Sequence, residues 1–177
     1  MQDQTQPPRT PDAETIAFAG RVFGYARAGQ AEALDGLLAR GLPPNLRNDK
    51  GDTLLMLASY HGHADAVRAL LDGGVDPEIA NDRGQTPLAA AAFKGDVPTV
   101  RLLLERGAAV DGRGEGGRTA LMVAAMFNRV AIVDLLLAHG ADPRVRDGAG
   151  HTAQDAAAAM GAADTPAQLA RAVAAQP

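Results

Sequence analysis

The sequence predicts an all-α solenoid, in which helix-turn-helix units stack side by side and β-hairpin loops connect each unit to the next. A glycine series recurs every 33 residues, at Gly51, Gly84, Gly117 and Gly150. The same spacing separates the threonines Thr53, Thr86, Thr119 and Thr152, and the Leu-Leu pairs at 70–71, 103–104 and 136–137. A fixed period of this length is typical of repeat proteins, whose units bury their apolar faces only against their neighbours.

The N-terminal region is predicted to hold a tail and a capping unit. Residues 1–11 are rich in Gln and Pro and are expected to be disordered. From Asp12 onward, Ile16, Ala19, Phe23 and Ala26 follow one another at helical spacing, which predicts an N-terminal capping helix. A degenerate copy of the repeat follows, with glycines at 29 and 41 and a Leu-Leu pair at 37–38.

Each complete unit is predicted to begin with a tight turn and a short first helix. In the unit that starts at residue 81, the segment 81–84 reads Asn-Asp-Arg-Gly, a sequence that favours a turn with positive φ. Thr86 can then cap the free amides of a helix, and Pro87 suits its first position. The small residues Ala91 and Ala92 give this helix a narrow apolar face.

A second helix follows in every unit. Asp96 can cap it and Pro98 lies in its first turn, where a missing amide costs little. Val100 and the Leu pair at 103–104 form its core stripe. The helix ends are marked by residues that tolerate positive φ, so we expect left-handed conformations there. These are Gly62, Gly95 and Asn128 after the first helices, and Gly74, Gly107 and Gly140 after the second.

These residues resemble the ankyrin repeat family. The matching pattern is Asn81-x-x-Gly84-x-Thr86-Pro87-Leu88-x-x-Ala91-Ala92-x-x-Gly95, followed by Val100-x-x-Leu103-Leu104-x-x-Gly107-Ala108. It covers residues 48–161 strongly, but Met56, Ala89 and Met122 replace the histidine that the family carries after its Thr-Pro-Leu. The resemblance implies one domain over residues 12–177. It divides into an N-terminal cap (12–47), repeats at 48–80, 81–113 and 114–146, and a C-terminal cap (147–177) with a polar outer side.

Composition narrows the possible functions. The net charge of −4 argues against a general nucleic-acid binder, and the absence of Cys removes disulfides and thiolate metal sites. No apolar run reaches the length of a transmembrane helix or has the form of a signal peptide. We therefore expect a cytoplasmic monomer without membrane contact.

Motifs that could carry chemistry are weak. Gly112-x-Gly114-x-x-Gly117 matches the dinucleotide fingerprint in letters, but it falls in a predicted turn and no strand precedes it. His61 and His63 could be a ligand pair, but no third ligand lies nearby in the sequence. The single serine, Ser59, takes the place of a packing alanine. We therefore predict no catalytic residue, metal or cofactor.

The remaining hypothesis is a surface that binds an unidentified protein. In the geometry that the ankyrin resemblance implies, hairpin tips and the ends of the first helices line a concave face. The predicted partner-binding residues are Arg27, Lys50, Asp52, Tyr60, His61, Arg83, Gln85, Phe93, Lys94, Arg118, Met126 and Phe127. The aromatic residues among them could be exposed as a ridge or could close over the grooves between helices. The alternative function is a small-molecule or metal-binding regulator, or an enzyme, centred on Tyr60, His61 and His63.

Overall fold

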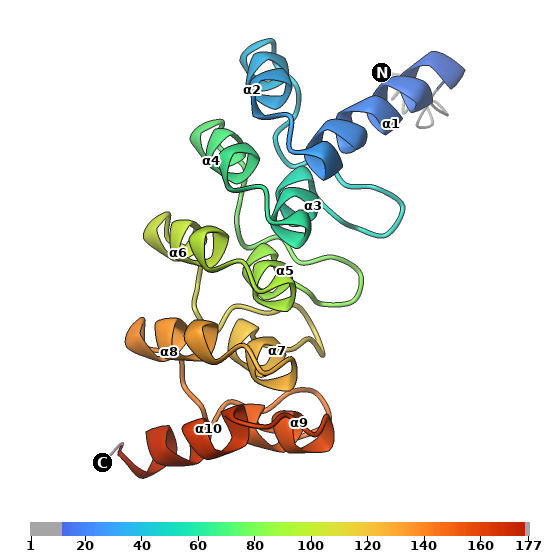
Figure 1. The fold of residues 1–177 in the computed structure, drawn as a ribbon. Helices are drawn as coiled ribbons and strands as arrows, with labels where there is room; N and C mark the ends of the chain where they lie inside the picture. Colours follow the sequence, from blue (N-terminus) through green and yellow to red (C-terminus); the bar gives the residue numbers. More distant parts are fainter. Residues whose placement is uncertain (1–11, 176–177) are drawn as a thin grey trace, which may run out of the picture.

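The computed structural model describes residues 12–175, which form ten helices in two parallel layers (Figure 1). The inner layer contains α1 (Ala13–Ala28), α3 (Leu54–His61), α5 (Pro87–Lys94), α7 (Ala120–Met126) and α9 (Ala153–Ala159). The outer layer contains α2 (Ala31–Ala39), α4 (Ala64–Asp72), α6 (Val97–Glu105), α8 (Val130–Ala138) and α10 (Thr165–Ala174). The predicted all-α solenoid is confirmed, whereas the prediction for residues 1–11 lies outside the described range.

The loops between units are hairpin-shaped and project to one side of the stack (Figure 1). Arg47 and Thr53 form an isolated antiparallel bridge, and residues 12–175 contain no longer β-ladder. The predicted β-hairpins are therefore tight turns without extended strands.

Threonine caps start the inner helices α3, α5, α7 and α9, as the sequence predicts. The Oγ1 atom of Thr53 accepts the amide of Met56 at 3.1 Å, and Thr86 accepts the amide of Ala89 at 3.3 Å. Thr119 and Thr152 repeat this arrangement in α7 and α9. Each bond satisfies an amide that has no partner within the helix.

The helix ends confirm the predicted left-handed residues. Gly107, after α6, has φ +88°, and Gly74 and Gly140 have φ +83° and +86°. Gly62 and Gly95 end α3 and α5 with φ +75° and +86°. At the matching place after α7, Asn128 has φ +54° and is the non-glycine residue with positive φ in the described range. Asparagine tolerates this conformation better than most residues.

The core lies between neighbouring units. Small residues separate the inner helices, with Ala58, Ala91 and Ala124 fully buried, whereas the outer helices contribute larger side chains such as Leu70 and Leu103, also fully buried. The inner helices α3, α5 and α7 contact one another more extensively than α4, α6 and α8 do. This difference follows from side-chain size, because alanine allows two helix axes to approach closely.

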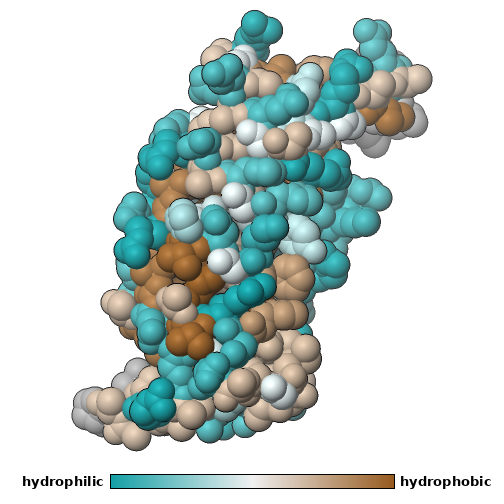
Figure 2. Space-filling model, viewed as in Figure 1, coloured by the Kyte–Doolittle hydropathy of each residue, from teal (hydrophilic) through white to brown (hydrophobic). Residues whose placement is uncertain are grey.

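The two ends of the stack differ from the prediction. Helix α1 forms, but only its C-terminal half packs: Phe23 and Ala26 are buried, whereas Ile16 is 60% exposed. No unit precedes α1 in the described residues to cover Ile16. At the other end, Leu169 is fully buried as predicted, but exposed Ala159 and Met160 accompany the expected polar residues of the cap. Figure 2 accordingly shows mostly pale brown surface over the lower end of the molecule.

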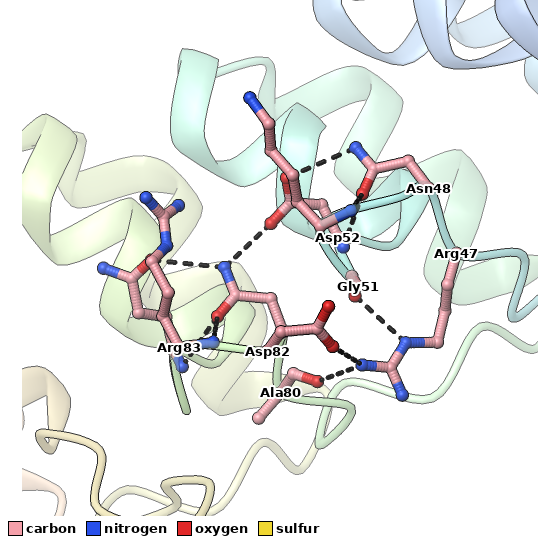
Figure 3. Close-up of polar contacts among 10 residues, drawn as sticks. Arg47, Asn48, Gly51, Asp52, Ala80, Asp82 and Arg83 are labelled. Atoms are coloured by element: carbon pink, nitrogen blue, oxygen red, sulfur yellow. Dashed lines mark hydrogen bonds and ion pairs between the residues drawn. The ribbon is translucent and has the colours of Figure 1, made fainter.

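Side chains bind the hairpin at 47–52 to the hairpin at 80–85 (Figure 3). The guanidinium of Arg47 donates to the carbonyl of Gly51 at 3.1 Å, to the carbonyl of Ala80 at 3.2 Å and to the carboxylate of Asp82 at 3.1 Å. Asn81 donates to Asp52 at 2.8 Å, and its Oδ1 accepts amides within its own loop. These bonds fix the position of one unit on its neighbour.

The hairpin at 111–117 contacts its neighbour through the backbone and not through an Asn side chain. Gly114 occupies the place of Asn81, so no side chain accepts the amides of Gly116 and Arg118. Instead, the Gly114 amide donates to the Gly84 carbonyl at 3.0 Å, and an added Cβ on Gly117 would lie 2.1 Å from that same oxygen. The glycines of this loop therefore permit close backbone contact, whereas the sequence indicated only a turn.

The inter-unit core predicts that Leu103→Ala destabilises the protein more than Leu37→Ala. Leu103 is fully buried between units on both sides, whereas Leu37 in α2 is only partly buried. Large-to-small changes in a core cost about 2–5 kcal/mol, and the Leu37 variant should fall below that range. Chemical denaturation measures both losses; equal losses would argue against a core divided between units.

The close contact between loops predicts opposite effects of two glycine-to-alanine changes. Gly117→Ala should destabilise by about 1–3 kcal/mol, because its Cβ overlaps the Gly84 carbonyl. Gly36→Ala, in the middle of α2 with no atom within 4 Å of the added Cβ, should stabilise by about 0.5–1 kcal/mol. Thermal or chemical unfolding checks both signs, and a neutral Gly117→Ala would show that the two loops separate readily.

Amide exchange should distinguish the hairpins. The amides of Arg83 and Gln85 donate to Asn81 at 3.0 and 3.1 Å. The matching amides of Gly116 and Arg118 lack this acceptor and should exchange faster. The amide of Gly114 donates to the Gly84 carbonyl, so its exchange does not report on the missing Asn side chain. Hydrogen exchange followed by NMR tests the expectation, which slower exchange at Gly116 than at Arg83 would contradict.

Candidate functional site

Three exposed aromatic side chains lie in a row at the ends of α3, α5 and α7. The rings of Tyr60 and Phe93 stack with centroids 5.3 Å apart and planes 12° from parallel. Phe93 then meets Phe127 edge to face at 4.7 Å and 84°. The exposed fractions are 45%, 36% and 38%, so the side chains form a surface ridge and do not close over the helices. We call these three residues the aromatic ladder.

The helix ends explain the geometry of the aromatic ladder. Tyr60 and Phe93 are one period apart, so stacking of α3 on α5 brings their rings face to face. Met126 holds the next position in phase, and Phe127 follows it as the C-cap of α7 with φ −98°. Being one residue further along the chain, Phe127 presents its edge to Phe93.

Two histidines continue the row of rings beyond Tyr60. His61 meets Tyr60 edge to face at 5.3 Å, and His63 stacks on His61 at 6.0 Å. The Nε2 atom of His63 lies 2.9 Å from the carbonyl oxygen of Arg27, which holds the ring against α1. Burial lowers the pKa of His61, and the neighbouring charges of His63, Lys94 and Arg27 lower it further. These surroundings therefore favour the neutral form of the His61 imidazole.

Features that could support chemistry do not converge. Within residues 12–175, no three His, Asp or Glu side chains are grouped as metal ligands. Ser59 is fully buried, and its hydroxyl has no access to a substrate. Gly114 and Gly117 of the dinucleotide-like motif lie against the backbone of Gly84 in the preceding hairpin, and the motif does not open a helix. No helix of this range is both long and apolar enough to span a bilayer.

Two adjoining depressions flank Phe93. The first, of about 330 Å³, has Tyr60 and Phe93 on one side and the apolar side chains of Met56 and Leu57 in its lining. The second, of about 650 Å³, lies towards Phe127 and is lined by Val123 among others. Arg83, Gln85 and Phe93 line both, so the two depressions adjoin, and we call them together the groove.

The hairpins supply the charged residues of this groove. Lys50 and Arg83 line the first depression, and Arg118 lines the second. Asp52 also lines the first depression, but the residue is only 6% exposed, and its carboxylate accepts a hydrogen bond from Asn81 at 2.8 Å. This carboxylate supports the loops, although the sequence pointed to it as a partner contact.

Asp147 is the acidic residue of the second depression. Its carboxylate accepts the amides of Ala149 and His151, each at 2.9 Å, and lies 3.6 Å from the Nε atom of Arg118. The amide of His151 is the main cause of its lowered pKa. The negative charge of Asp147 is therefore already stabilised by partners on the hairpins.

The structure brings together most of the residues that the sequence singled out. The first depression is lined by Lys50, Asp52, Tyr60, His61, Arg83, Gln85 and Phe93, and the second adds Arg118, Met126 and Phe127. Arg27 and Lys94 lie outside both linings. The floor residues Met56, Leu57, Ala90 and Val123 were missed, because their apolar character in the sequence is the same as that of core positions.

Comparison with known proteins agrees with this architecture. A family model of ankyrin repeats (3 copies) matches residues 23–113 and residues 73–147. A Pseudomonas aeruginosa protein named as an ankyrin repeat protein is 61% identical over 51 residues, which make up 29% of this chain and 30% of that protein. The chain thus spans less than a third of the length of this relative. Since the family matches overlap and extend over most of the helical stack, the chain belongs to the ankyrin repeat family.

Proposed function

We propose that residues 12–177 form one non-catalytic domain that binds a partner protein on the concave face of the stack. The observation that carries the proposal is the aromatic ladder, three exposed rings in contact beside the groove of two adjoining depressions. Clustered exposed aromatic surface is uncommon on a monomer and often marks an interaction site. Aromatic and arginine side chains are also the residue types that dominate binding energy at protein interfaces.

The groove suits recognition better than catalysis. Its lining contains aromatic, aliphatic and basic side chains, but no nucleophile beside a general base. The alternative regulator or enzyme centred on Tyr60, His61 and His63 lacks a third ligand within the described residues. A metal panel in thermal unfolding would separate the two ideas, because the alternative requires a shift that His61→Ala and His63→Ala abolish.

Removal of two aromatic anchors should abolish partner capture. Tyr60→Ala combined with Phe93→Ala leaves in place the hydrogen bond that the Arg129 guanidinium donates to the Phe93 carbonyl, and it removes only the exposed rings. Each anchor at an interface centre contributes about 2 kcal/mol or more, so the double variant should bind at least about a hundredfold more weakly. The measurement is a quantitative pull-down from the native cell, after circular dichroism confirms folding.

The matched control changes two exposed residues of the outer helices, Arg68→Ala and Arg101→Ala. This variant should capture the same partner at full strength. If the control loses the partner while the aromatic double variant keeps it, binding occurs on the outer helices and the proposal is wrong.

A further inference from the structure

The groove beside the aromatic ladder has two walls of different chemistry. The ends of the inner helices supply an apolar wall, formed by Tyr60 and Phe93 in the first depression and by Phe127 in the second. The hairpins supply a wall that carries Lys50, Arg83 and Arg118, and apolar side chains such as Met56 lie between. A ligand along the stack would therefore meet rings on one side and cations on the other.

The two acidic residues that line this groove, Asp52 and Asp147, already have hydrogen-bond partners, and the exposed Asp49 and Glu115 of the same hairpins are not part of its lining. Asp52 accepts bonds from Asn81 at 2.8 Å and from Asn48 at 3.3 Å, and it is almost completely buried. Asp147 accepts two loop amides and lies 3.6 Å from Arg118. Neither carboxylate has free capacity to neutralise the other cations of the groove.

Lys50 and Arg83 keep their charges available. In the part of the chain that the structure describes, neither ammonium nor guanidinium group forms an ion pair or a hydrogen bond. Asp82, next to Arg83 in sequence, pairs with Arg47 at 3.1 Å. Figure 3 shows its carboxylate directed at that guanidinium. The groove is thus locally basic although the chain has a net charge of −4.

We propose that this groove binds an extended, acidic segment of the partner protein, one that carries aromatic or aliphatic anchor residues. This inference rests on the proposed function, since it specifies the partner of the same face. Side chains of an extended segment alternate between its two sides, so anchors can face the ladder while carboxylates face Lys50 and Arg83. The complementary charges speed association and discriminate against basic segments.

Charge distribution favours such a peptide over a single-stranded nucleic acid. Aromatic rings beside cations also occur in nucleic-acid channels, where basic side chains follow the phosphates closely. Here the basic wall holds three cations, one of which shares its charge with Asp147. A phosphate chain would in addition meet the overall negative charge of the protein.

Selection from a displayed library of random peptides of about 12 residues, on the immobilised full chain, tests the proposal. Selected peptides should be enriched in Asp, Glu and aromatic or aliphatic residues. One fluorescein-labelled selected peptide is then titrated by anisotropy against wild type and against Lys50→Glu with Arg83→Glu. The expected result is at least about tenfold weaker binding to this variant, and weaker wild-type binding as salt rises.

The matched control is Arg68→Glu with Arg101→Glu, which makes the same change in charge on the outer helices and should leave the affinity within about twofold. Lys50→Gln with Arg83→Gln serves if the reversed variant does not fold by circular dichroism. A labelled oligothymidylate should bind more weakly than the peptide. Tighter oligothymidylate binding, selection of neutral or basic peptides, or insensitivity to charge reversal would overturn the proposal.

The outcomes separate this inference from the proposed function. If the selected peptides are neutral or basic, and bind wild type but not the variant Tyr60→Ala with Phe93→Ala, the proposed binding face is supported. The inference of an acidic segment is then rejected. If the binding of the selected peptides is unchanged in both the aromatic and the charge-reversed variants, both the proposed binding face and the acidic segment are rejected. A selection that yields no peptide specific for the wild-type groove over the charge-reversed variant also counts against the acidic segment.

Discussion

Packing between neighbouring units is the interaction on which the rest of this structure depends. Nine of the ten helices in residues 12–175 have between seven and ten residues, and isolated helices shorter than about 12–15 residues are marginal in water. Each helix therefore exists because its apolar face is covered by the next unit. The fully buried series Ala58, Ala91 and Ala124 and the buried leucines of the outer layer repeat this contact along the stack. Ile16 shows the consequence in the first described helix, since no residue within 12–175 belongs to a preceding unit that could cover it.

Polar loops then set how each unit is oriented on the next. Asn45, Glu78 and Asp111 each accept an amide 31 residues further along the chain, from Asp76, Ala109 and Asp142. Three different side chains thus perform the same task at equivalent positions, because the backbone of the following unit always presents a donor there. Asp111 is partly buried at this contact, and this burial raises the pKa of its carboxyl group.

The aromatic ladder is positioned by this stacking. Its rings do not stabilise the interior, yet their spacing is set by the packing of α3, α5 and α7 below them. In the proposed function, a surface that is already formed before binding reduces the entropy lost on association. The groove also keeps two cations unpaired next to apolar surface, an arrangement that a partner of opposite charge can complete.

The sequence by itself determined the architecture, because the periodic residues act locally. A threonine cap, a glycine at a helix end and a leucine on a core stripe impose the same conformation in every unit, and repetition makes the pattern readable. Asn128 in place of glycine was predictable for the same reason. Most of the candidate groove residues could also be predicted from the sequence, since the period places helix ends and hairpins on one face.

Only the tertiary structure decided the properties that depend on contacts between units. It showed that Phe93 and Phe127 are exposed and in contact, that Asp52 is buried in a hydrogen-bond network, and that Gly117 lies against Gly84. It also identified Met56 and Val123 as groove lining. These properties arise from the distance and orientation of residues about one repeat apart. A sequence motif gives their spacing along the chain but not which side chain covers the other.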